Sequence, residues 1–388
     1  MSQNRCKIGD FIEQTNIKNK TLKVKKLLGV SIEKKFIDSI ANTVGTDFSN
    51  YKIVNSGEFA YGPVTSRNGD KLSIALLKDY EQCIVSSSYI TFKVKENVNI
   101  IPDYLMLIFS NAEFDRYARY NSWGSVREMF QWEDLCAAEI NLPSINEQEI
   151  IVKRYNYIKE RIAIIEQLKN NLIETVLTYY NNLLGEYTID SDELPNGWRK
   201  TTIGEYADVK SGYAFKSEWW TNTGIPTIKI GNIVENSINI EFCDYVIDEN
   251  AKKAKDFWVK KGDLLIAMTG ATTGKIGIVS EYTSNSVVNQ RVGKFFLGNE
   301  PLKRLPFLFC VLNSKEVAYQ IHPNGDKGSA QDNLSPDDIK NIKIIMPPNT
   351  IVNDFNLKLN EIFNFITILD DEKVTLNKVI NNLINSSY

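Results

Sequence analysis

Residues 151–179 read IVKRYNYIKERIAIIEQLKNNLIETVLTY, and apolar side chains recur along them at steps of four and three. The same steps return 204 positions later, where residues 355–383 read FNLKLNEIFNFITILDDEKVTLNKVINNL. An apolar repeat of about 3.5 residues places one stripe along one side of a helix and favours a left-handed coiled coil. The two series are Ile151, Tyr155, Ile158, Ile162, Ile165, Lys169, Leu172, Val176 and Tyr179, and Phe355, Leu359, Ile362, Ile366, Leu369, Lys373, Leu376, Ile380 and Leu383.

Each stripe is too long for a helix that packs only on its own domain. We expect helices over residues 146–183 and 350–385, each roughly 57 Å long at about 1.5 Å per residue. The two stripes are each other's obvious partner, and the large segment between them lets the chain turn back, which predicts an antiparallel pair. Pairing of each helix with another chain is the alternative.

The expected contact line between the helices, which we call the seam, includes one lysine from each. A lysine is costly inside an apolar seam, and Lys169 and Lys373 would therefore help to fix the register of the pair. The seam residues are Ile158, Ile162, Ile165, Lys169 and Leu172 on the first helix, and Ile362, Ile366, Leu369, Lys373 and Leu376 on the second.

The segments that precede the two helices also repeat. KIGDF (residues 7–11) is echoed by TIGEY (202–206), and NSGEF (55–59) by KKGDL (260–264). Gly124-Ser125 matches Gly328-Ser329, Phe130 matches Leu334, Asp134-Leu135 matches Asp338-Ile339, and Pro143 matches Pro347. Few side chains are identical, but the glycines, the apolar phase and the order are kept. The chain therefore carries an internal duplication.

The predicted fold class is α+β. Short β-rich runs at residues 84–85, 89–94 and 263–268, and helical segments over 102–114 and 301–317, indicate mixed domains. We expect two mixed α/β domains in tandem, separated by two long helices that pair as an antiparallel coiled coil, with a pseudo-two-fold internal repeat. The expected divisions are 1–143, a central helix over 144–186, 187–346 with a linker at 184–198, and a C-terminal helix over 347–388.

Composition excludes several classes of protein. The chain has 388 residues, enough for two or three domains. Its five cysteines form no CxxC pair and its one histidine is His322, which argues against a disulfide framework and against a Cys/His zinc site. The start has no signal-peptide pattern and no apolar stretch is long enough to cross a bilayer, so we expect a cytoplasmic protein.

The charge balance limits how the chain could bind nucleic acid. Forty-five basic and 48 acidic residues give a net charge of −3, which argues against a protein that coats nucleic acid by bulk attraction. DNA phosphates would have to meet local lysine clusters or a basic partner, and a solvated lysine face explains each cluster equally well. The clusters are Lys18, Lys20, Lys23, Lys25 and Lys26, and Lys252, Lys253, Lys255, Lys260 and Lys261.

Two short motifs look like enzyme sites and fail on their spacing. GATTGK (residues 270–275) has three residues between its glycines and an isoleucine after the lysine, whereas a phosphate-binding loop needs four and a Ser or Thr. A glycine-rich hairpin explains it better. PDDIK (336–340) follows Ser335 and is typical of a helix start, with proline and acids in the first turn. We therefore expect no catalytic residue and no metal site.

The order of these features resembles the specificity subunit of Type I restriction-modification systems, over essentially the whole chain. The matching strings in the first half are Gly57-Glu58-Phe59, Trp123-Gly124-Ser125 and LPSINEQ (142–148). Those in the second half are GDLLI (262–266) with Gly270 and Gly274, VNQR (288–291), GSAQ (328–331) and MPP (346–348). NTIV (349–352) departs from the family, because it replaces the usual acidic-glutamine pair at the start of the helix.

The resemblance implies a subunit that binds double-stranded DNA and has no catalytic activity of its own. Each domain would read one half of a bipartite site, and the helices would set the spacer. The family's specificity subunit binds two methyltransferase (modification) subunits, which use S-adenosylmethionine, and restriction/translocase subunits can join. No cofactor is therefore expected in this chain, and no membrane is expected as a partner.

Base recognition needs guanidinium, amide and hydroxyl groups on loops that enter a groove. Each candidate could equally contact a phosphate or be structural, and we expect Trp219 and Trp220 to be packing residues. The candidates in the first domain are Thr65, Ser66, Arg67, Asn68, Ser87, Tyr89, Trp123, Ser125 and Arg127. Those in the second are Tyr213, Lys216, Thr269, Thr272, Thr273, Lys275, Asn289, Gln290, Arg291, Lys327 and Gln331.

Two other classes of function remain open at this point. One is a non-DNA scaffold whose coiled coil holds other proteins, and the other is an enzyme that binds a nucleotide at residues 269–275. A salt-dependent and sequence-dependent shift on DNA separates the first from a specificity subunit. Nucleotide-induced stabilisation that is lost in Lys275→Ala would support the second.

Overall fold

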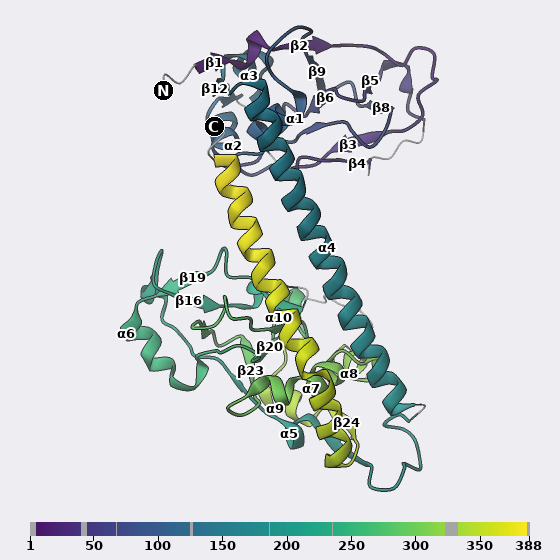
Figure 1. Ribbon diagram of the computed structural model, residues 1–388, viewed down its shortest axis with the longest axis vertical. Coiled ribbons are helices and arrows are strands. Elements are labelled where there is room, and N and C mark those ends of the chain that lie inside the picture. The colour runs from purple at the N-terminus through teal and green to yellow at the C-terminus, as the bar shows by residue number, and fades with distance from the viewer. Residues whose placement is uncertain are drawn as a thin grey trace. The chain divides into compact units, whose positions relative to one another are not determined.

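The computed structural model describes residues 5–39, 45–66, 68–124, 127–185, 187–234, 236–322 and 333–385. The chain divides into two compact units: unit 1 is Met1–Arg161 with Leu376–Tyr388, and unit 2 is Ile162–Thr375. Two long helices, α4 (Ile145–Leu184) and α10 (Asn349–Asn385), contribute residues to both units. Figure 1 labels the larger elements of both units, including α4 and α10.

Unit 1 is built on an antiparallel sheet in the order β2-β9-β6-β7. These strands are β2 (Ile12–Thr15), β9 (Ile90–Val94), β6 (Phe59–Tyr61) and β7 (Ile74–Leu76). The two-stranded pairs are β1 (Arg5–Lys7) with β12 (Glu139–Asn141), β3 (Leu28–Val30) with β4 (Phe36–Asp38), β5 (Lys52–Asn55) with β8 (Gln82–Val85), and β10 (Ser122–Trp123) with β11 (Met129–Phe130). The helices are α1 (Pro102–Phe109), α2 (Ala112–Tyr120) and α3 (Trp132–Ala137), with 3-10 turns η1 (Ile8–Asp10) and η2 (Phe48–Asn50).

Unit 2 contains a six-stranded sheet and a smaller four-stranded sheet. The larger has the order β14 (Asp208–Ser211), β23 (Val292–Phe296), β20 (Leu264–Ala267), β21 (Ile276–Ile278), β18 (Asn236–Ile238), β17 (Ile233–Val234). The smaller has the order β15 (Trp220–Thr221), β19 (Asp244–Val246), β16 (Ile225–Ile228), β22 (Val287–Val288), and β13 (Arg199–Thr202) pairs separately with β24 (Lys343–Met346). The helices are α5 (Ile203–Tyr206), α6 (Asp248–Ala251), α7 (Leu305–Leu312), α8 (Lys315–Ile321) and α9 (Pro336–Asn341), with 3-10 turns η3 (Ser217–Trp219), η4 (Ile230–Asn232), η5 (Lys252–Phe257), η6 (Gly270–Thr272) and η7 (Pro301–Lys303).

The internal duplication predicted from the sequence is confirmed by the topology. The order β14-β23-β20-β21 in unit 2 repeats β2-β9-β6-β7 in unit 1. The turn before the third strand is also the same, because Gly57 and Gly262 have φ values of 84° and 86°. One residue later, Glu58 Oε2 accepts a hydrogen bond from Asn55 N (2.9 Å), and Asp263 Oδ2 accepts one from Lys260 N (3.0 Å).

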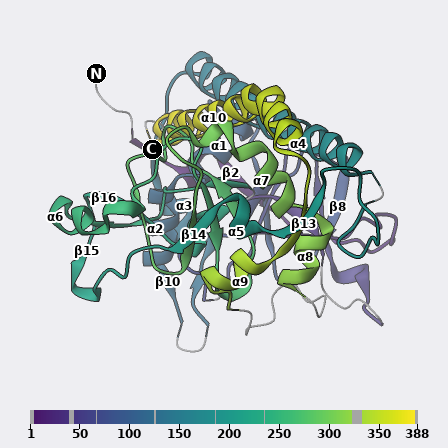
Figure 2. The same cartoon turned by 90° about the horizontal axis from the view of Figure 1, so that it is seen from below.

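A second matched pair of glycines explains the KIGDF and TIGEY echo. A Cβ atom on Gly9 would lie 2.7 Å from Cys136 Cβ, and one on Gly204 would lie 3.1 Å from Lys340 Cβ. Each glycine therefore allows the chain to approach the short helix near the end of its own domain. Figure 2 shows this contact in unit 2, where α5 and α9 lie together beside β14.

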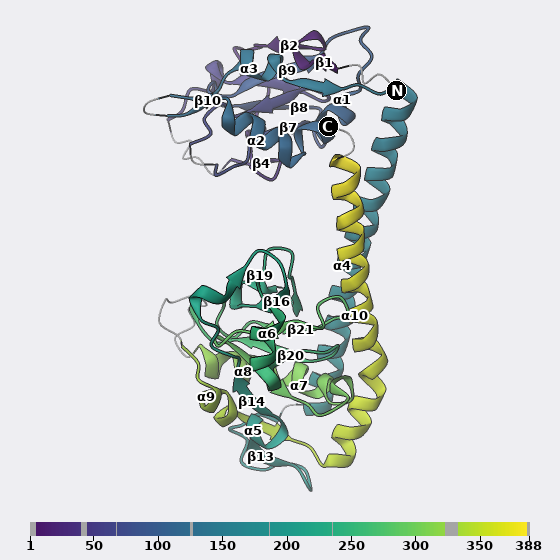
Figure 3. The same ribbon diagram turned by 90° about the vertical axis from the view of Figure 1, so that its left-hand side faces the viewer.

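Within unit 2 the two long helices run antiparallel. Lys169 Nζ lies 2.7 Å from Asp370 Oδ1, and Glu166 Oε1 lies 2.8 Å from Lys373 Nζ. Going from residue 166 to residue 169 on α4, the partner on α10 changes from residue 373 to residue 370, so the two helices run in opposite directions. Figures 1 and 3 both show the helices side by side in this unit. The side chains of both helices share one apolar core with the sheet and α7.

The buried series on the helices agrees with the expected seam at Ile162, Ile165, Lys169, Ile366 and Leu369 and departs from it at the other seam positions. On α4 it is Ile162, Ile165, Lys169, Ile173, Val176, Tyr180 and Leu184, while Leu172 is half-buried and Tyr179 is 42% exposed. On α10 the buried residues are Val352, Phe355, Asn356, Leu359, Phe363, Ile366, Thr367, Leu369, Ile380 and Ile384. Four further residues of the expected seam are half-buried: Ile158 on α4, and Ile362, Lys373 and Leu376 on α10. At four steps the buried residue is the next one along the chain, because a straight helix has about 3.6 residues per turn and drifts from a strict heptad. Ile173, Tyr180, Phe363 and Ile384 are buried in place of Leu172, Tyr179, Ile362 and Leu383. The stripe also packs on the domain core as well as on the other helix.

The expected helices over 102–114 and 301–317 are each wrong in extent. The first is divided into α1 and α2, because Asn111 begins a new helix and its Oδ1 accepts from Glu113 N (2.8 Å). The second is divided at Ser314, whose Oγ accepts from Val317 N (3.3 Å) and caps α8. Asn and Ser favour such N-cap positions because their side chains satisfy free backbone N–H groups.

The start of each long helix is fixed to its domain by a buried amide. Ser144 and Glu147 form a capping box, since Ser144 N donates to Glu147 Oε2 (2.9 Å) and Glu147 N donates to Ser144 Oγ (3.4 Å). Next to it, fully buried Gln148 accepts from Ile101 N (3.0 Å) and donates to the carbonyls of Asn99 and Pro143.

Val352 stands where the first half has Gln148, and another residue does the anchoring in unit 2. Asn356 Oδ1 accepts from Phe307 N (2.9 Å) in the first turn of α7, and its Nδ2 donates to Tyr206 Oη (3.0 Å). The two halves therefore hold the same kind of helix junction with amides one turn apart.

Replacing Gln148 with leucine tests this anchoring. Ile101 N and the carbonyls of Asn99 and Pro143 would lose their hydrogen-bond partner, and an unsatisfied group that is shielded from water costs about 1–3 kcal/mol. We expect Gln148→Leu to lower the free energy of unfolding by at least ~2 kcal/mol in urea titrations, while the exposed neighbour variant Glu149→Leu leaves it within about 0.5 kcal/mol. Equal stability of the two variants would contradict the role of the amide.

Candidate nucleic-acid interface

Most first-domain candidates lie at one edge of the unit 1 sheet. β2 ends opposite the start of β9, and β6 ends at Tyr61 opposite both Ile90 and Ile74, so loops 62–73 and 86–89 leave the sheet together. The β10–β11 hairpin joins them, because Phe130 N donates to Pro63 O (2.8 Å) and Thr65 N donates to Glu128 O (3.0 Å). Antiparallel pairing thus gathers three loops that are distant in sequence.

Burial separates the first-domain candidates into two groups. Thr65 is buried with its N and Oγ1 both bonded to Glu128 O, Tyr89 Oη accepts from Val30 N, and Asn68 Nδ2 donates to Val64 O. These three side chains shape the loops. The exposed candidates are Ser66, Ser87, Trp123 (66% exposed) and Arg127. Arg67 and Ser125 lie outside the described residues.

A buried ion pair holds the far end of loop 62–73. Asp115 Oδ1 on α2 accepts from Leu72 N (2.9 Å) and from Lys34 Nζ (2.5 Å), and Lys34 Nζ also donates to Leu72 O (2.9 Å). Burial lowers the pKa of Lys34 from its ordinary value, and the neighbouring carboxylate acts in the opposite direction. The loop is therefore closed by specific polar contacts at its base, which leaves its tip at Ser66 exposed.

Unit 2 presents an equivalent edge. β14 ends opposite the start of β23, and β20 ends where β21 begins, so Tyr213, loop 269–275 and turn 289–291 lie at the same end of the sheet. Met268 N donates to Arg291 O (3.1 Å), and Leu334 N donates to Met268 O (2.8 Å). The hydrogen bond from Leu334 N to Met268 O is the counterpart of the bond from Phe130 N to Pro63 O. This agreement supports the match of Phe130 with Leu334 that the sequence repeat predicts.

The second-domain candidates also divide by burial. Thr273 is buried and its Oγ1 donates to Gly270 O (2.7 Å), Asn289 Oδ1 accepts from Arg291 N (3.5 Å), and Tyr213 stacks on Trp219. Thr269 and Thr272 are half-buried, and Lys216, Lys275, Gln290 and Arg291 are exposed. Lys327 and Gln331 lie outside the described residues. The hairpin interpretation of GATTGK is confirmed, because this segment joins the antiparallel strands β20 and β21.

Two lysines that are distant in the sequence lie over the same tryptophan ring in this domain. Lys253 Nζ lies 4.1 Å from the ring centre of Trp219, and Lys216 Nζ lies 5.5 Å from the same centre. Both lysines are exposed, and Trp219 is half-buried beside Tyr213. The fold thus brings together two cations that are 37 positions apart, next to the loop edge. Other lysines of the expected clusters are paired, such as Lys26 with Asp38 and Lys252 with Asp248.

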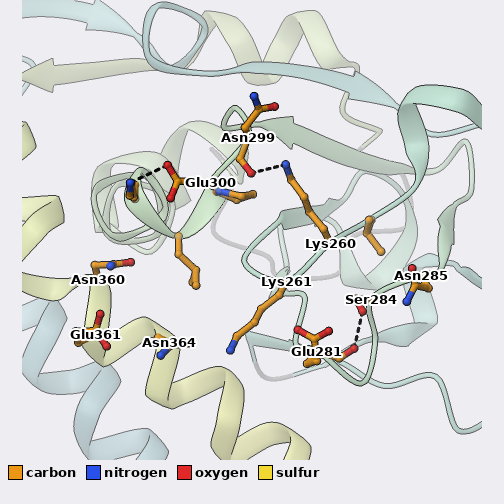
Figure 4. A pocket seen from close by; sticks show the side chains of 14 residues that line it. Lys260, Lys261, Glu281, Ser284, Asn285, Asn299, Glu300, Asn360, Glu361 and Asn364 are labelled. Atoms are coloured by element: carbon orange, nitrogen blue, oxygen red, sulfur yellow. Dashed lines mark hydrogen bonds and ion pairs between the residues drawn. The ribbon is translucent and has the colours of Figure 1, made fainter.

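A polar hollow of about 610 Å³ lies elsewhere in unit 2, between the domain and α10. Figure 4 shows Lys260 donating to the Asn299 carbonyl (2.7 Å), and Lys303 pairs with Glu300 (2.7 Å). Glu281 and Glu361 also line it, so the hollow carries both signs of charge and does not resemble a phosphate site.

Neither a metal site nor a membrane span is found among the residues that the structure describes. No group of three or more His, Cys, Asp or Glu side chains in these ranges is placed to hold a metal ion. Within the same part of the chain, no helix has both the length and the apolar character to cross a bilayer.

Comparison with known families matches both halves of the chain. The model of the Type I restriction modification DNA specificity domain matches residues 5–174 and again residues 195–386. The chain belongs to this family. The two matches cover one copy each of the duplicated domain and its long helix.

Relatives of the family agree over most of the chain. The protein is 24% identical over 319 residues to the Type I restriction enzyme MjaVIII specificity subunit of Methanocaldococcus jannaschii, covering 78% of this chain and 72% of the relative. The MjaIX specificity subunit of the same organism is 23% identical over 297 residues, covering 72% and 66%. The Type I restriction-modification S subunit structure from M. genitalium has the same fold, with a TM-score of 0.53 at 15% identity, covering 99% and 96%.

The two loop edges of a DNA specificity domain protein can be tested one at a time. Arg127→Ala should weaken selection in one half of the DNA site, and Arg291→Ala in the other, by about 1–3 kcal/mol if each arginine contacts a base. Binding titrations on duplexes with changes in either half measure this effect. Arg199→Ala, an exposed arginine on β13 away from the edge, is the matched control. An equal effect of each variant on both halves would contradict the assignment.

Proposed function

We propose that this chain is the sequence-specific DNA-binding specificity subunit of a Type I restriction-modification complex. Each domain reads one half of a bipartite site, and the paired helices set the spacer. The observation that carries the proposal is the duplication, in which two copies of one sheet present polar loops at the same edge. A duplicated domain on a helical spacer is suited to a target with two parts.

Recognition of each half would depend on a few exposed side chains. Arginine pairs well with guanine, and amide groups pair with adenine, in the major groove. Arg127 in the first domain, and Gln290 and Arg291 in the second, are exposed at the loop edges. Lys216 and Lys253 beside Trp219 would contact phosphates, which position the protein without reading sequence.

Exposed apolar stripes on the long helices support a helical protein partner. Along α4 the exposed residues recur at steps of seven, seven, four and eleven, which keeps them on one side of the helix. They are Ile150, Tyr157, Ile164, Leu168 and Tyr179, and on α10 the exposed set is Leu357, Phe365, Ile368 and Val379. Exposed apolar stripes of this length mark interaction sites. We assign them to two methyltransferase subunits, one for each copy of the repeat.

The chemistry of the complex would then belong to the partners. The methyltransferase subunits would bind S-adenosylmethionine and modify the DNA, and restriction/translocase subunits would join them, while this chain contributes no catalytic group. The net charge of −3 fits this division, because basic partner surfaces would help to enclose the duplex. With duplex DNA as its target, we place the complex in the cytoplasm.

Selection from a random duplex pool tests the proposal. With the methyltransferase subunits present, the complex should enrich two short motifs separated by one fixed gap. A single continuous motif would contradict the bipartite reading. Absence of a DNA shift at any salt concentration would favour a scaffold that binds only proteins.

The spacer role of the helices makes a separate prediction. Seven residues inserted after Arg161 in α4, together with seven after Thr375 in α10, keep the apolar phase within about 20°. The helices lengthen by ~10 Å, so the gap should grow by about three base pairs at 3.4 Å each. Seven residues inserted after Asp192, in the linker, should leave the gap unchanged. An unchanged gap in the double insertion would contradict the spacer role.

A further inference from the structure

A buried polar cluster lies where the second domain meets both long helices. Lys169 on α4 donates from Nζ to Asp370 Oδ1 on α10 (2.7 Å) and also to Ser237 Oγ on β18. Ser237 Oγ in turn donates to the Asp370 carboxylate, at 2.9 Å from Oδ2. The side chains of Lys169 and Asp370 are only 10% and 12% exposed. One lysine, one carboxylate and one hydroxyl therefore connect three separate elements.

The next residue on α10 makes a second contact with the domain. Asp371 Oδ1 accepts a hydrogen bond from Tyr282 N at 3.0 Å. One turn away, the more exposed pair of Glu166 and Lys373 joins the helices to each other. Two adjacent aspartates of α10 thus hold two different segments of the second domain at one level of the helix pair.

The apolar surroundings make this cluster specific for one register. If α10 moved by one turn in either direction, Ile366 or Val374 would replace Asp370 opposite Lys169. The lysine would then be buried without an anion, and Ser237 would lose its acceptor. A buried ion pair adds little stability compared with a well-packed apolar pair, but a buried charge that loses its partner is strongly unfavourable. The ion pair of Lys169 with Asp370 therefore acts mainly by making other registers of α4 against α10 unfavourable.

We propose that Lys169, Asp370 and Ser237 are positioning residues that fix the second domain on the helix pair and so restrict the DNA spacer to one length. This inference rests on the proposed function, because it concerns the gap between the two half-sites. The three residues act through the placement of β18 and of the domain that carries it.

The test compares gap profiles of the complete complex with its methyltransferase subunits. Duplexes carry both half-site motifs with the gap varied in steps of one base pair. The double variant Lys169→Leu/Asp370→Leu replaces the buried ion pair with two apolar side chains, and this variant should fold. We expect it to retain both motifs while its preference for the best gap over the neighbouring gaps falls by roughly tenfold, a size typical of coupling between two sites.

Two further variants separate positioning from general stability. The exchanged pair Lys169→Asp/Asp370→Lys restores opposite charges and should restore the sharp gap profile. The matched control Glu166→Leu/Lys373→Leu removes the more exposed pair one turn away and should leave the profile sharp. A lower melting temperature without a change in the gap profile would indicate a structural role only.

The outcomes distinguish this inference from the proposed function. If the wild-type complex selects one gap and the double leucine variant has the same profile, the positioning role is overturned while the bipartite reading stands. If the wild-type complex enriches no two-part motif, the proposed function is overturned and the positioning role with it.

Discussion

The pairing of α4 with α10 in unit 2 is the constraint on which this fold depends. Val176 and Tyr180 of α4, and Phe355 and Phe363 of α10, belong to the same apolar core as the second-domain sheet and α7. Neither helix can slide without breaking packing that the domain also needs, because protein interiors are close-packed. Helix pair and domain therefore form one mechanical unit, and the polar cluster at Lys169 selects its register.

Duplication explains which features are kept between the halves and which differ. The strand order, the left-handed turn at Gly57 and Gly262, and the close approach at Gly9 and Gly204 are common to both copies. These features are set by backbone geometry, so few residues can replace them. The loops at the sheet edge, by contrast, differ in sequence between the two copies. A scaffold of this kind can change what it recognises by changing loops while its backbone framework remains.

The sequence alone predicted the features that have a strong period or a backbone requirement. The heptad spacing located both long helices, and the matched glycines located the duplicated domain. The partners of buried polar groups were not predicted, because Asp370 and Ser237 meet Lys169 only after the chain folds. Likewise, Thr65 and Thr273 are polar loop residues that the sequence suggests are exposed. Only the structure shows that their hydroxyl groups donate hydrogen bonds to the backbone carbonyls of Glu128 and Gly270.

The antiparallel pairing of the two long helices within one chain can be measured directly. Zero-length carbodiimide coupling tests it on the unmodified protein, since the reagent joins an amine to a carboxylate only when the two are in contact. Equal amounts of ¹⁴N- and ¹⁵N-labelled protein are mixed before coupling, and the linked peptides are identified by mass spectrometry. We expect an amide between Lys373 and Glu166 with both peptides carrying the same label. A linkage found only between peptides of different label, or helix cross-links in parallel register, would contradict it.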